Sequence, residues 1–225
     1  MIVGKGLIAS LFSDCDRHDV VFFASGVSNS SETSKANFDR ENTLVTEVLQ
    51  NNTDKLFVYF STCSIYDSSK YNSPYVLHKL HMEEIIKQNA SNYLILRVSN
   101  AVGKGGNPHL LVNYLHRQIA SKNPINIHKN ATRNLIDVED IKQITLDYIT
   151  KKKYNQILNL AYPENFHIAE VVEILEEELA TQAIKHFENK GEHYSIDVSM
   201  LTYQFKELNR SQYLKNIVKK YYNQR

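Results

Sequence analysis

Three nearly continuous apolar runs constrain the fold more than any other feature of this sequence. They are Val20–Ala24 (VVFFA), Leu56–Phe60 (LFVYF) and Tyr93–Val98 (YLILRV). A strand with one wet face alternates apolar and polar residues, whereas short unbroken apolar runs are typical of strands that are buried on both faces. The sequence therefore predicts a parallel sheet that helices cover on both sides.

The segments around these runs carry helical patterns. Asn37–Gln50 and Tyr75–Gln88 place apolar residues on one helix face, and both lie between two apolar runs. A strand at Met1–Val3 and a helix at Leu7–Phe12 precede them. This alternation of strands and helices predicts a Rossmann-like α/β fold with right-handed crossovers.

The turn after the first predicted strand is rich in glycine. Gly4-Lys5-Gly6-Leu7-Ile8-Ala9 reads G-x-G-x-x-A, which lets backbone N–H groups approach a pyrophosphate. A βα turn without a ligand can show the same short pattern. Its position between a strand and a helix favours a phosphate-binding turn, with the helix N-terminus facing the phosphate charge.

A segment expected of a dinucleotide fold is missing. Only Leu11–Asp19 separates the first predicted helix from the strand at Val20–Ala24. A further strand–helix–strand unit does not fit into nine residues. The sequence therefore predicts a Rossmann-like sheet that lacks some strands on the adenine side, where an acidic residue normally holds the adenosine ribose.

The second half of the chain shows a looser pattern. The segments predicted there are helices at His109–Ser121, Val138–Thr150, Ile168–Leu179, Val198–Phe205 and Gln212–Tyr222, and a strand at Ile157–Leu160. We expect residues 1–105 to form a dinucleotide-binding core. Residues 106–225 would form mainly a small α/β substrate-binding lobe, with segments around residues 132–160 returning to the core.

Composition narrows the choice of partners and location. The net charge is +1, with 26 Lys and Arg against 25 Asp and Glu, so no basic field favours nucleic acid or an anionic membrane. No apolar run approaches the ~20 residues of a membrane-spanning helix. Two cysteines suit reduced thiols in the cytoplasm, and no Cys or His spacing indicates a metal site.

One tyrosine and one lysine stand a helical turn apart. The spacing Y-x-x-x-K puts Tyr75 and Lys79 on one face of the predicted helix. An ammonium close to a tyrosine favours the phenolate and lowers a pKa that is ordinarily ~10. With the Thr62 hydroxyl beside it, the pair suits proton transfer to or from a carbinol during hydride transfer. An ordinary helix surface is the alternative interpretation.

Several ordered motifs resemble those of extended short-chain dehydrogenases, the group of UDP-galactose 4-epimerase and the sugar-nucleotide dehydratases. They are SPYVLHKLHMEEII, FSTCSIYD, LRVSNAVGKGGNP, ATRNLIDVEDI and FFASGVSNS, the last followed by a helix that bears Asn42 at a structural position. The resemblance implies that Thr62, Tyr75 and Lys79 are catalytic. It places NAD or NADP on Gly4, Gly6, Leu7, Ile8, Ala24, Ser25, Gly26, Tyr75, Lys79 and Val98. It places a nucleotide sugar on Thr62, Cys63, Asn100 and Arg133.

The same motifs narrow the reaction. Dehydratases of this group carry an acid pair where this chain has Cys63 and Ser64, so we disfavour dehydration. Reduction of a 4-keto nucleotide sugar and epimerisation through transient oxidation both remain. Because the adenine side is missing, we favour a reductase slightly over an epimerase. Its expected substrate is a dTDP-, UDP- or GDP-linked hexose used in surface-polysaccharide synthesis. His78 is expected at the surface.

Two further hypotheses, about catalysis and about oligomeric state, remain open. The shortened cofactor half could mark a non-catalytic descendant that binds a sugar nucleotide or a partner protein. The resemblance also implies a homodimer that pairs the helices at Asn37–Gln50 and Tyr75–Gln88 into a four-helix bundle.

Overall fold

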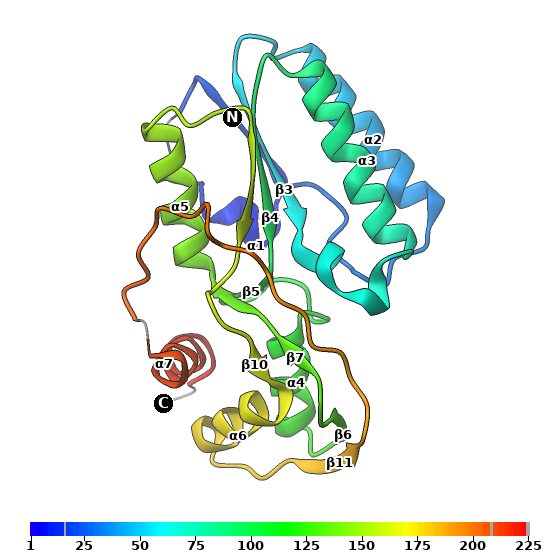
Figure 1. Cartoon of the computed structure of the whole chain (residues 1–225), viewed down its shortest axis with the longest axis vertical. Helices are drawn as coiled ribbons and strands as arrows, with labels where there is room; N and C mark the ends of the chain where they lie inside the picture. The colour runs from blue at the N-terminus through cyan, green and yellow to red at the C-terminus, as the bar shows by residue number, and fades with distance from the viewer. Residues whose placement is uncertain (16, 208, 224–225) are drawn as a thin grey trace.

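A five-stranded parallel sheet forms the centre of the molecule. The computed structural model describes residues 1–225 except residues 16, 208, 224 and 225. The sheet has the order β1-β2-β3-β4-β9, and every neighbouring pair is parallel (Figure 1). Its strands are β1 (Ile2–Val3), β2 (Val20–Phe23), β3 (Leu56–Thr62), β4 (Asn92–Val98) and β9 (Gln156–Leu160). The predicted Rossmann-like fold is confirmed.

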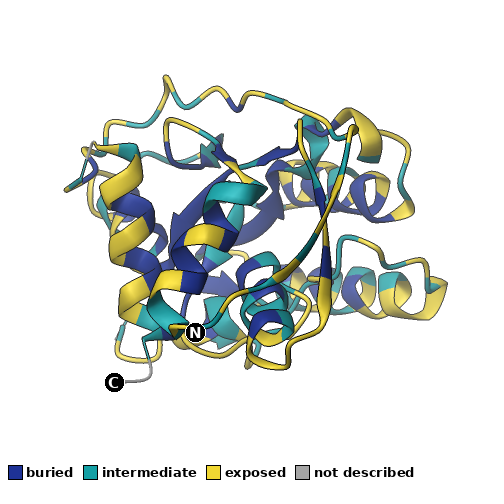
Figure 2. Cartoon of the chain, turned by 90° about the horizontal axis from the view of Figure 1, so that it is seen from below, coloured by how far each residue is buried: buried dark blue, intermediate teal, exposed yellow. Residues whose placement is uncertain are grey.

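Both faces of the sheet are covered, which explains the unbroken apolar runs. Every residue of β2 and β3 is buried, and Figure 2 shows the central strands in dark blue between helices. Phe22 and Val58 pack on one face, in the same cluster as Phe12. Phe23 and Tyr59 pack on the other face. Neighbouring residues of one strand therefore enter different halves of the core.

Two long helices cover one face of the sheet. α2 (Lys35–Gln50) and α3 (Pro74–Asn89) lie side by side in Figure 1 and bury Val45 and Met82 in the same cluster as Phe23. α3 begins where Ser73 caps it, because the Ser73 hydroxyl accepts a hydrogen bond from the Val76 N–H at 3.2 Å. Pro74 follows at the first helical position, where its missing N–H costs nothing.

The helix after the glycine turn is shorter than predicted. α1 spans Leu7–Ser10, not Leu7–Phe12. The N–H groups of Leu11 and Phe12 donate to carbonyls only three residues back, which tightens the turn and ends the helix. Phe12 then stacks on Phe22, with the ring centroids 4.3 Å apart. On this face α5 (Val138–Thr150), which has the predicted bounds, completes the cover.

The remaining elements build the lobe in the lower half of Figure 1. Its helices are α4 (Leu111–Ala120), α6 (Ile168–Leu179) and α7 (Arg210–Tyr222). Its strands form three short pairs: β5 (Asn100–Val102) with β8 (Leu135–Asp137), β7 (Thr132–Arg133) with β10 (Phe166–His167), and β6 (Pro124–His128) with β11 (Ile184–Glu188). Two 3₁₀ turns, η1 (Cys63–Tyr66) and η2 (Ser68–Lys70), follow β3. The division of function near residue 105 stays a proposal.

The helix predicted at Val198–Phe205 is wrong. This segment has no regular secondary structure; the chain runs from the lobe up to the sheet and then turns back toward α7 (Figure 1). Its backbone bonds to side chains of other elements. The Tyr148 hydroxyl donates to the Met200 carbonyl at 2.6 Å and accepts from the Thr202 N–H at 3.3 Å. The Asp197 carboxylate accepts from the Ser199 N–H at 2.9 Å, which favours a turn over a helix.

Candidate functional site

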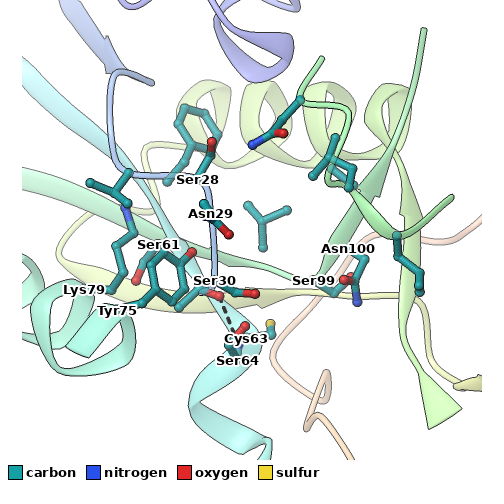
Figure 3. Close-up of a pocket in the computed structure, with 18 of the residues that line it drawn as sticks. Ser28, Asn29, Ser30, Ser61, Cys63, Ser64, Tyr75, Lys79, Ser99 and Asn100 are labelled. Atoms are coloured by element: carbon teal, nitrogen blue, oxygen red, sulfur yellow. Dashed lines mark hydrogen bonds between the residues drawn. The ribbon is translucent and has the colours of Figure 1, made fainter. Parts of the chain in front are cut away.

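A cavity of about 430 Å³ lies at the carboxyl ends of the central strands. Ala24 and Gly26 line it just after β2, Ser61 and Thr62 at the end of β3, and Val98 at the end of β4. This end of a parallel α/β sheet is where ligands bind in such folds. In Figure 3, Tyr75 and Lys79 stand on one side of the cavity, and Ser99 and Asn100 on the other.

The cavity brings most of the predicted site residues together. Those in its lining are Thr62, Tyr75, Lys79, Ile8, Ala24, Gly26, Val98, Cys63, Asn100 and Arg133. Gly4, Gly6, Leu7 and Ser25 are not in that lining. Polar residues that sequence reasoning missed also line it. They include Ser28, Asn29 and Ser30 from the loop after β2, and Asp67 and Lys70.

Thr62 and Tyr75 meet because the end of β3 lies beside the start of α3. Both residues line the cavity, and the Thr62 hydroxyl oxygen accepts a hydrogen bond from the Ser64 N–H at 3.0 Å. Burial raises the pKa of Tyr75 to about 12, and the Glu41 carboxylate adds to the rise. The expected lowering of the Tyr75 pKa by Lys79 is therefore wrong. At neutral pH Tyr75 is a phenol, which can donate a proton.

The Lys79 ammonium is hydrogen-bonded to Glu41 and Tyr59. Lys79 Nζ donates to Glu41 Oε1 at 3.1 Å and to the Tyr59 hydroxyl at 2.8 Å. The Lys79 side chain is 2% exposed and that of Glu41 is fully buried. Burial lowers the pKa of Lys79, and Glu41 acts in the opposite direction. The pair is thus a buried ion pair beside the cavity.

The expectation for His78 is also wrong. His78 is 9% exposed, stacks on Phe38 with centroids 4.6 Å apart, and places Nε2 3.0 Å from Glu41 Oε2. The buried polar residue of α2 is Glu41, one position before Asn42, to which the resemblance gave a structural role. A signal for Glu41 exists in the sequence, because it shares a helix face with Val45 and Leu49, four and eight residues on.

The opposite side of the cavity carries hydrogen-bond donors. Asn100 Nδ2 donates to the Asn134 carbonyl at 2.8 Å. Arg133 Nη2 lies 3.6 Å from Asp67 Oδ2, and its guanidinium lies 5.8 Å from the centroid of the Tyr194 ring. The Arg133 side chain is 27% exposed, which leaves donors for an anionic group. Asp67, 5% exposed, balances part of the Arg133 charge.

Cys63 is a packed thiol in the cavity wall. Its Sγ donates to the Arg97 carbonyl at 2.9 Å, and burial raises the pKa of the thiol. A protonated, buried thiol is a poor nucleophile. Within the part of the chain that the structure describes, no group of three or more His, Cys, Asp or Glu could hold a metal ion, and no helix is long and apolar enough to cross a membrane.

The residues fit one half of a nicotinamide dinucleotide. Tyr75, Lys79 and Gly26 form a wall against which a nicotinamide and its ribose would lie. The adenosine half meets a different situation. Among the described residues the sheet ends at β1, and residues 11–19 link α1 directly to β2.

Gly4 is required by the packing of the backbone. Its φ is +127°, and a Cβ at this position would lie 2.5 Å from the carbonyl oxygen of Ala24, so a larger residue would not fit.

Glu41 leads to a prediction about acid stability. Burial raises its pKa, but Lys79, His78, Tyr59 and the Val27 N–H outweigh burial and hold it well below 4.5. A carboxyl whose pKa is depressed on folding stabilises the protein above its unfolded pKa, and this contribution is lost as the pH falls. We expect the free energy of unfolding, measured with urea, to fall more steeply in the wild type than in Glu41→Gln as the pH drops below about 4.5. Equal slopes would contradict the prediction.

Comparisons with known proteins agree with the fold. Residues 4–161 match the NAD dependent epimerase/dehydratase family. The chain is similar to RMD from Pseudomonas aeruginosa, solved with NADPH (TM-score 0.71, 16% identity, 94% of this chain and 84% of that chain). It is similar to UDP-glucuronic acid 4-epimerase from Bacillus cereus, solved with UDP-glucuronic acid and NAD (0.71, 21%, 96% and 79%).

A third solved structure has the same fold. It is UDP-N-acetylglucosamine 4-epimerase from Methanobrevibacter ruminantium M1, in complex with UDP-N-acetylmuramic acid (TM-score 0.69, 18% identity, 93% of this chain and 78% of that chain). A comparison with curated protein sequences gives no match.

Proposed function

The chain belongs to the NAD-dependent epimerase/dehydratase family, and from this we propose that it is an NAD(P)-dependent oxidoreductase acting on a nucleotide-linked sugar. One observation carries the proposal. Thr62, Tyr75 and Lys79 line the same cavity as Asn100 and Arg133, so a proton-transfer group and phosphate-binding donors face one ligand space. The B. cereus epimerase, which has this fold, was solved with both a UDP-sugar and NAD.

Each residue has a role in this proposal. Thr62 and Tyr75 would hold the reacting sugar oxygen, and Lys79 and Gly26 would lie against the nicotinamide ribose. Asn100 and Arg133 would bind the diphosphate. The nicotinamide, when bound, supplies or accepts the hydride at the sugar carbon. In the reducing direction the Tyr75 hydroxyl gives its proton to the carbonyl oxygen, and the product is an alcohol.

Reduction is the reaction we favour within this class. A reductase needs a proton donor at the carbonyl oxygen, and the Tyr75 hydroxyl in the cavity lining can supply that proton. Epimerisation also needs the reverse step, in which the same oxygen takes a proton. Dehydration is not proposed, because Cys63 and Ser64 occupy the positions where dehydratases have two acids.

The test is direct. We expect purified protein to oxidise NADH or NADPH when a UDP-, dTDP- or GDP-linked 4-keto hexose is added, with loss of the cofactor absorbance. The free nucleotide without the sugar is the control and should give no loss. A protein that binds neither cofactor in a fluorescence titration, and turns over none of these sugars, would refute the proposal.

A second candidate is a non-catalytic protein that binds a sugar nucleotide. The observation that favours it is the direct link of α1 to β2, which leaves the adenine side without the usual strands among the described residues. Binding of a UDP-sugar by dialysed protein, together with no binding of NADH or NADPH, would favour this candidate over the oxidoreductase.

We also propose three properties of the whole protein. Two free cysteines, Cys15 and Cys63, suit the cytoplasm. A nucleotide-sugar substrate suits the synthesis of surface polysaccharide. A homodimer would pair α2 and α3, which lie side by side at the surface (Figure 1) and expose Leu77 and His81 among polar neighbours. Sedimentation of the purified protein would test the dimer.

A further inference from the structure

The loop that joins β5 to α4 forms part of the cavity. This β5–α4 loop spans residues 103–110 and contains no helix or strand. Its residues Asn107, His109 and Leu110 line the cavity. The loop follows β5, whose first residue, Asn100, stands across the cavity from Tyr75 (Figure 3). Its conformation therefore shapes the ligand space on the side where we propose that the diphosphate binds.

Two glycines give the β5–α4 loop a backbone that needs support from other elements. Gly105 and Gly106 both have φ +80°, a left-handed conformation that other residues rarely adopt. A Cβ on Gly105 would meet no atom within 4 Å, so the space around this residue is open. Glycine loses more conformational freedom on ordering than any other residue. Contacts from neighbouring elements must therefore hold the loop in the shape that lines the cavity.

Apolar packing holds the loop against the helices beside the sheet. A Cβ on Gly106 would lie 3.2 Å from Leu7 Cβ, and one on Gly103 would lie 2.8 Å from Val138 Cγ1. Leu7 is the first residue of α1, and Val138 is the first residue of α5. Apolar contacts of this kind have no preferred direction, so they do not fix the orientation of the peptide groups in the loop.

Asn113 on α4 supplies the directional contacts. Its Nδ2 donates to the Gly105 carbonyl at 2.9 Å and to the Asn107 carbonyl at 3.0 Å. Asn107 Oδ1 in turn accepts from the His109 N–H at 2.9 Å, and the Asn107 carbonyl accepts from the Leu110 N–H at 3.0 Å. All three residues of the loop that line the cavity are thus connected to one side-chain amide.

A tyrosine of α7 sets the orientation of that amide. The Tyr222 hydroxyl donates to Asn113 Oδ1 at 2.5 Å. A side-chain amide has one acceptor oxygen and one donor NH₂ group, so a donor at the oxygen decides where the NH₂ group points. Tyr222 is 8% exposed, and its ring centroid lies 5.1 Å from that of His116, so packing holds the hydroxyl in place. The last residue of α7 therefore orients the amide that holds the loop.

We propose that Asn113 and Tyr222 are positioning residues of the nucleotide-sugar site, which hold the β5–α4 loop in its binding conformation. Neither residue is in the cavity lining, so both act through the loop and not by contact with the ligand. The identity of the ligand rests on the proposed function, whereas the support of the loop does not. The last turn of α7 thereby becomes part of the binding site.

A second hollow, of about 230 Å³, lies next to the loop. It is lined by Gly105, Gly106, Pro108, Asn113, His116 and Arg117. The part of the loop that Asn113 holds therefore borders open space, into which it can move when a hydrogen bond is lost. Loss of the Tyr222 bond should loosen the loop without opening the core, since local opening needs only local contacts to break.

Hydrogen exchange tests the proposal without any ligand. In Tyr222→Phe the amides of residues 103–110 should exchange about three- to ten-fold faster than in the wild type, the factor expected for one hydrogen bond. Asn113→Ala removes both bonds to the loop and should give a larger increase. Amides of β2 and β3 should keep their wild-type rates, which separates a local loosening from a loss of global stability.

Kinetics give a second readout. With NADH and a UDP-linked 4-keto hexose, the KM for the sugar nucleotide should rise about three- to ten-fold in Tyr222→Phe. The kcat should stay within about two-fold, because the loop binds the ligand and takes no part in the reaction. The KM for NADH should also stay within about two-fold, because the packing of Gly106 on Leu7 is unchanged.

Asn113→Asp separates the hydrogen bonds from the shape of the side chain. The carboxylate keeps the size of Asn113 and can still accept from Tyr222, but it cannot donate to the carbonyls of the loop. Asn113→Asp should therefore raise the KM for the sugar nucleotide at least as far as Asn113→Ala. A wild-type KM in Asn113→Asp would overturn the proposal. If Asn113→Ala fails to fold, the Asp variant also takes its place in the exchange experiment.

Tyr221→Phe is the matched control. Tyr221 precedes Tyr222 on α7, and its hydroxyl donates to Asp137 Oδ1 at 2.6 Å, not to the loop. This variant should leave both the exchange of the loop and the KM for the sugar nucleotide at their wild-type values. Wild-type exchange of the loop in Tyr222→Phe overturns the proposal, as does a Tyr221→Phe variant that matches Tyr222→Phe.

The two levels of proposal fail separately. If the wild type turns over no keto-sugar and binds no UDP-sugar, the proposed function falls, while hydrogen exchange still decides what holds the loop. If the enzyme is active and Tyr222→Phe has a wild-type KM, the oxidoreductase stands and the positioning role falls.

Discussion

Tyr75→Phe is expected to lose roughly 10²- to 10⁴-fold in kcat, the range for removal of a positioned acid or base. The change deletes one oxygen, the hydroxyl of a residue that lines the cavity together with Thr62. The phenyl ring keeps its packing in the cluster with Val27 and Val76, so the fold should persist. NADH oxidation with a keto-sugar nucleotide measures the loss, and calorimetric titration with the same nucleotide checks that binding stays within about three-fold.

Tyr59→Phe is the informative comparison. Tyr59 is also a buried tyrosine close to Lys79, but it lies behind the cavity and is not in its lining. We expect it to lose far less rate at neutral pH than Tyr75→Phe. Equal losses, or full activity of Tyr75→Phe, would remove Tyr75 from the reaction.

The second large effect concerns stability. Arg97→Met should lower the free energy of unfolding by about 3–5 kcal/mol, the cost of leaving a buried partner charge unpaired. Arg97 Nη2 donates to Glu83 Oε2 at 2.6 Å and Arg97 Nε to Glu83 Oε1 at 3.0 Å. The Glu83 side chain is 2% exposed and also accepts a hydrogen bond from the Ser61 hydroxyl at 2.5 Å. Urea unfolding monitored by circular dichroism gives the difference.

Two variants check the cause of that loss. Arg117→Met on the exposed side of α4 should change the free energy of unfolding by no more than about 0.5 kcal/mol. Adding Glu83→Gln to Arg97→Met should recover part of the loss, because the uncompensated carboxylate is then gone. A double variant that is less stable than Arg97→Met would show that shape and not charge sets the cost.

Local pattern was enough to predict the sheet and most helices. The three apolar runs became β2, β3 and β4, and α5 and α6 have the predicted bounds. Elements of the lobe were harder, since β6 has only five residues and β11, also of five, has no fully buried residue. Their pairing joins residues about sixty positions apart, which no local pattern records.

The site divides in a similar way. Thr62, Tyr75 and Lys79 stand in motifs that can be read directly, and the structure places them in one cavity. The partner of Lys79 could not be read, because Glu41 lies 38 positions earlier and meets it only when α2 packs beside α3. Glu41 does lie on the same face of α2 as Val45 and Leu49, so a signal for its burial was present in the sequence but not for its partner.

The fifth strand of the sheet has a consequence for how the chain folds. β9 pairs with β4 in parallel, yet the whole of α4, β5 to β8 and α5 lies between them in sequence. Closing so long an excursion costs entropy before the pairing returns any free energy, so the docking of β9 should be a late and slow event. A chain cut near residue 105 would leave β4 as an open edge, prone to pair with other chains.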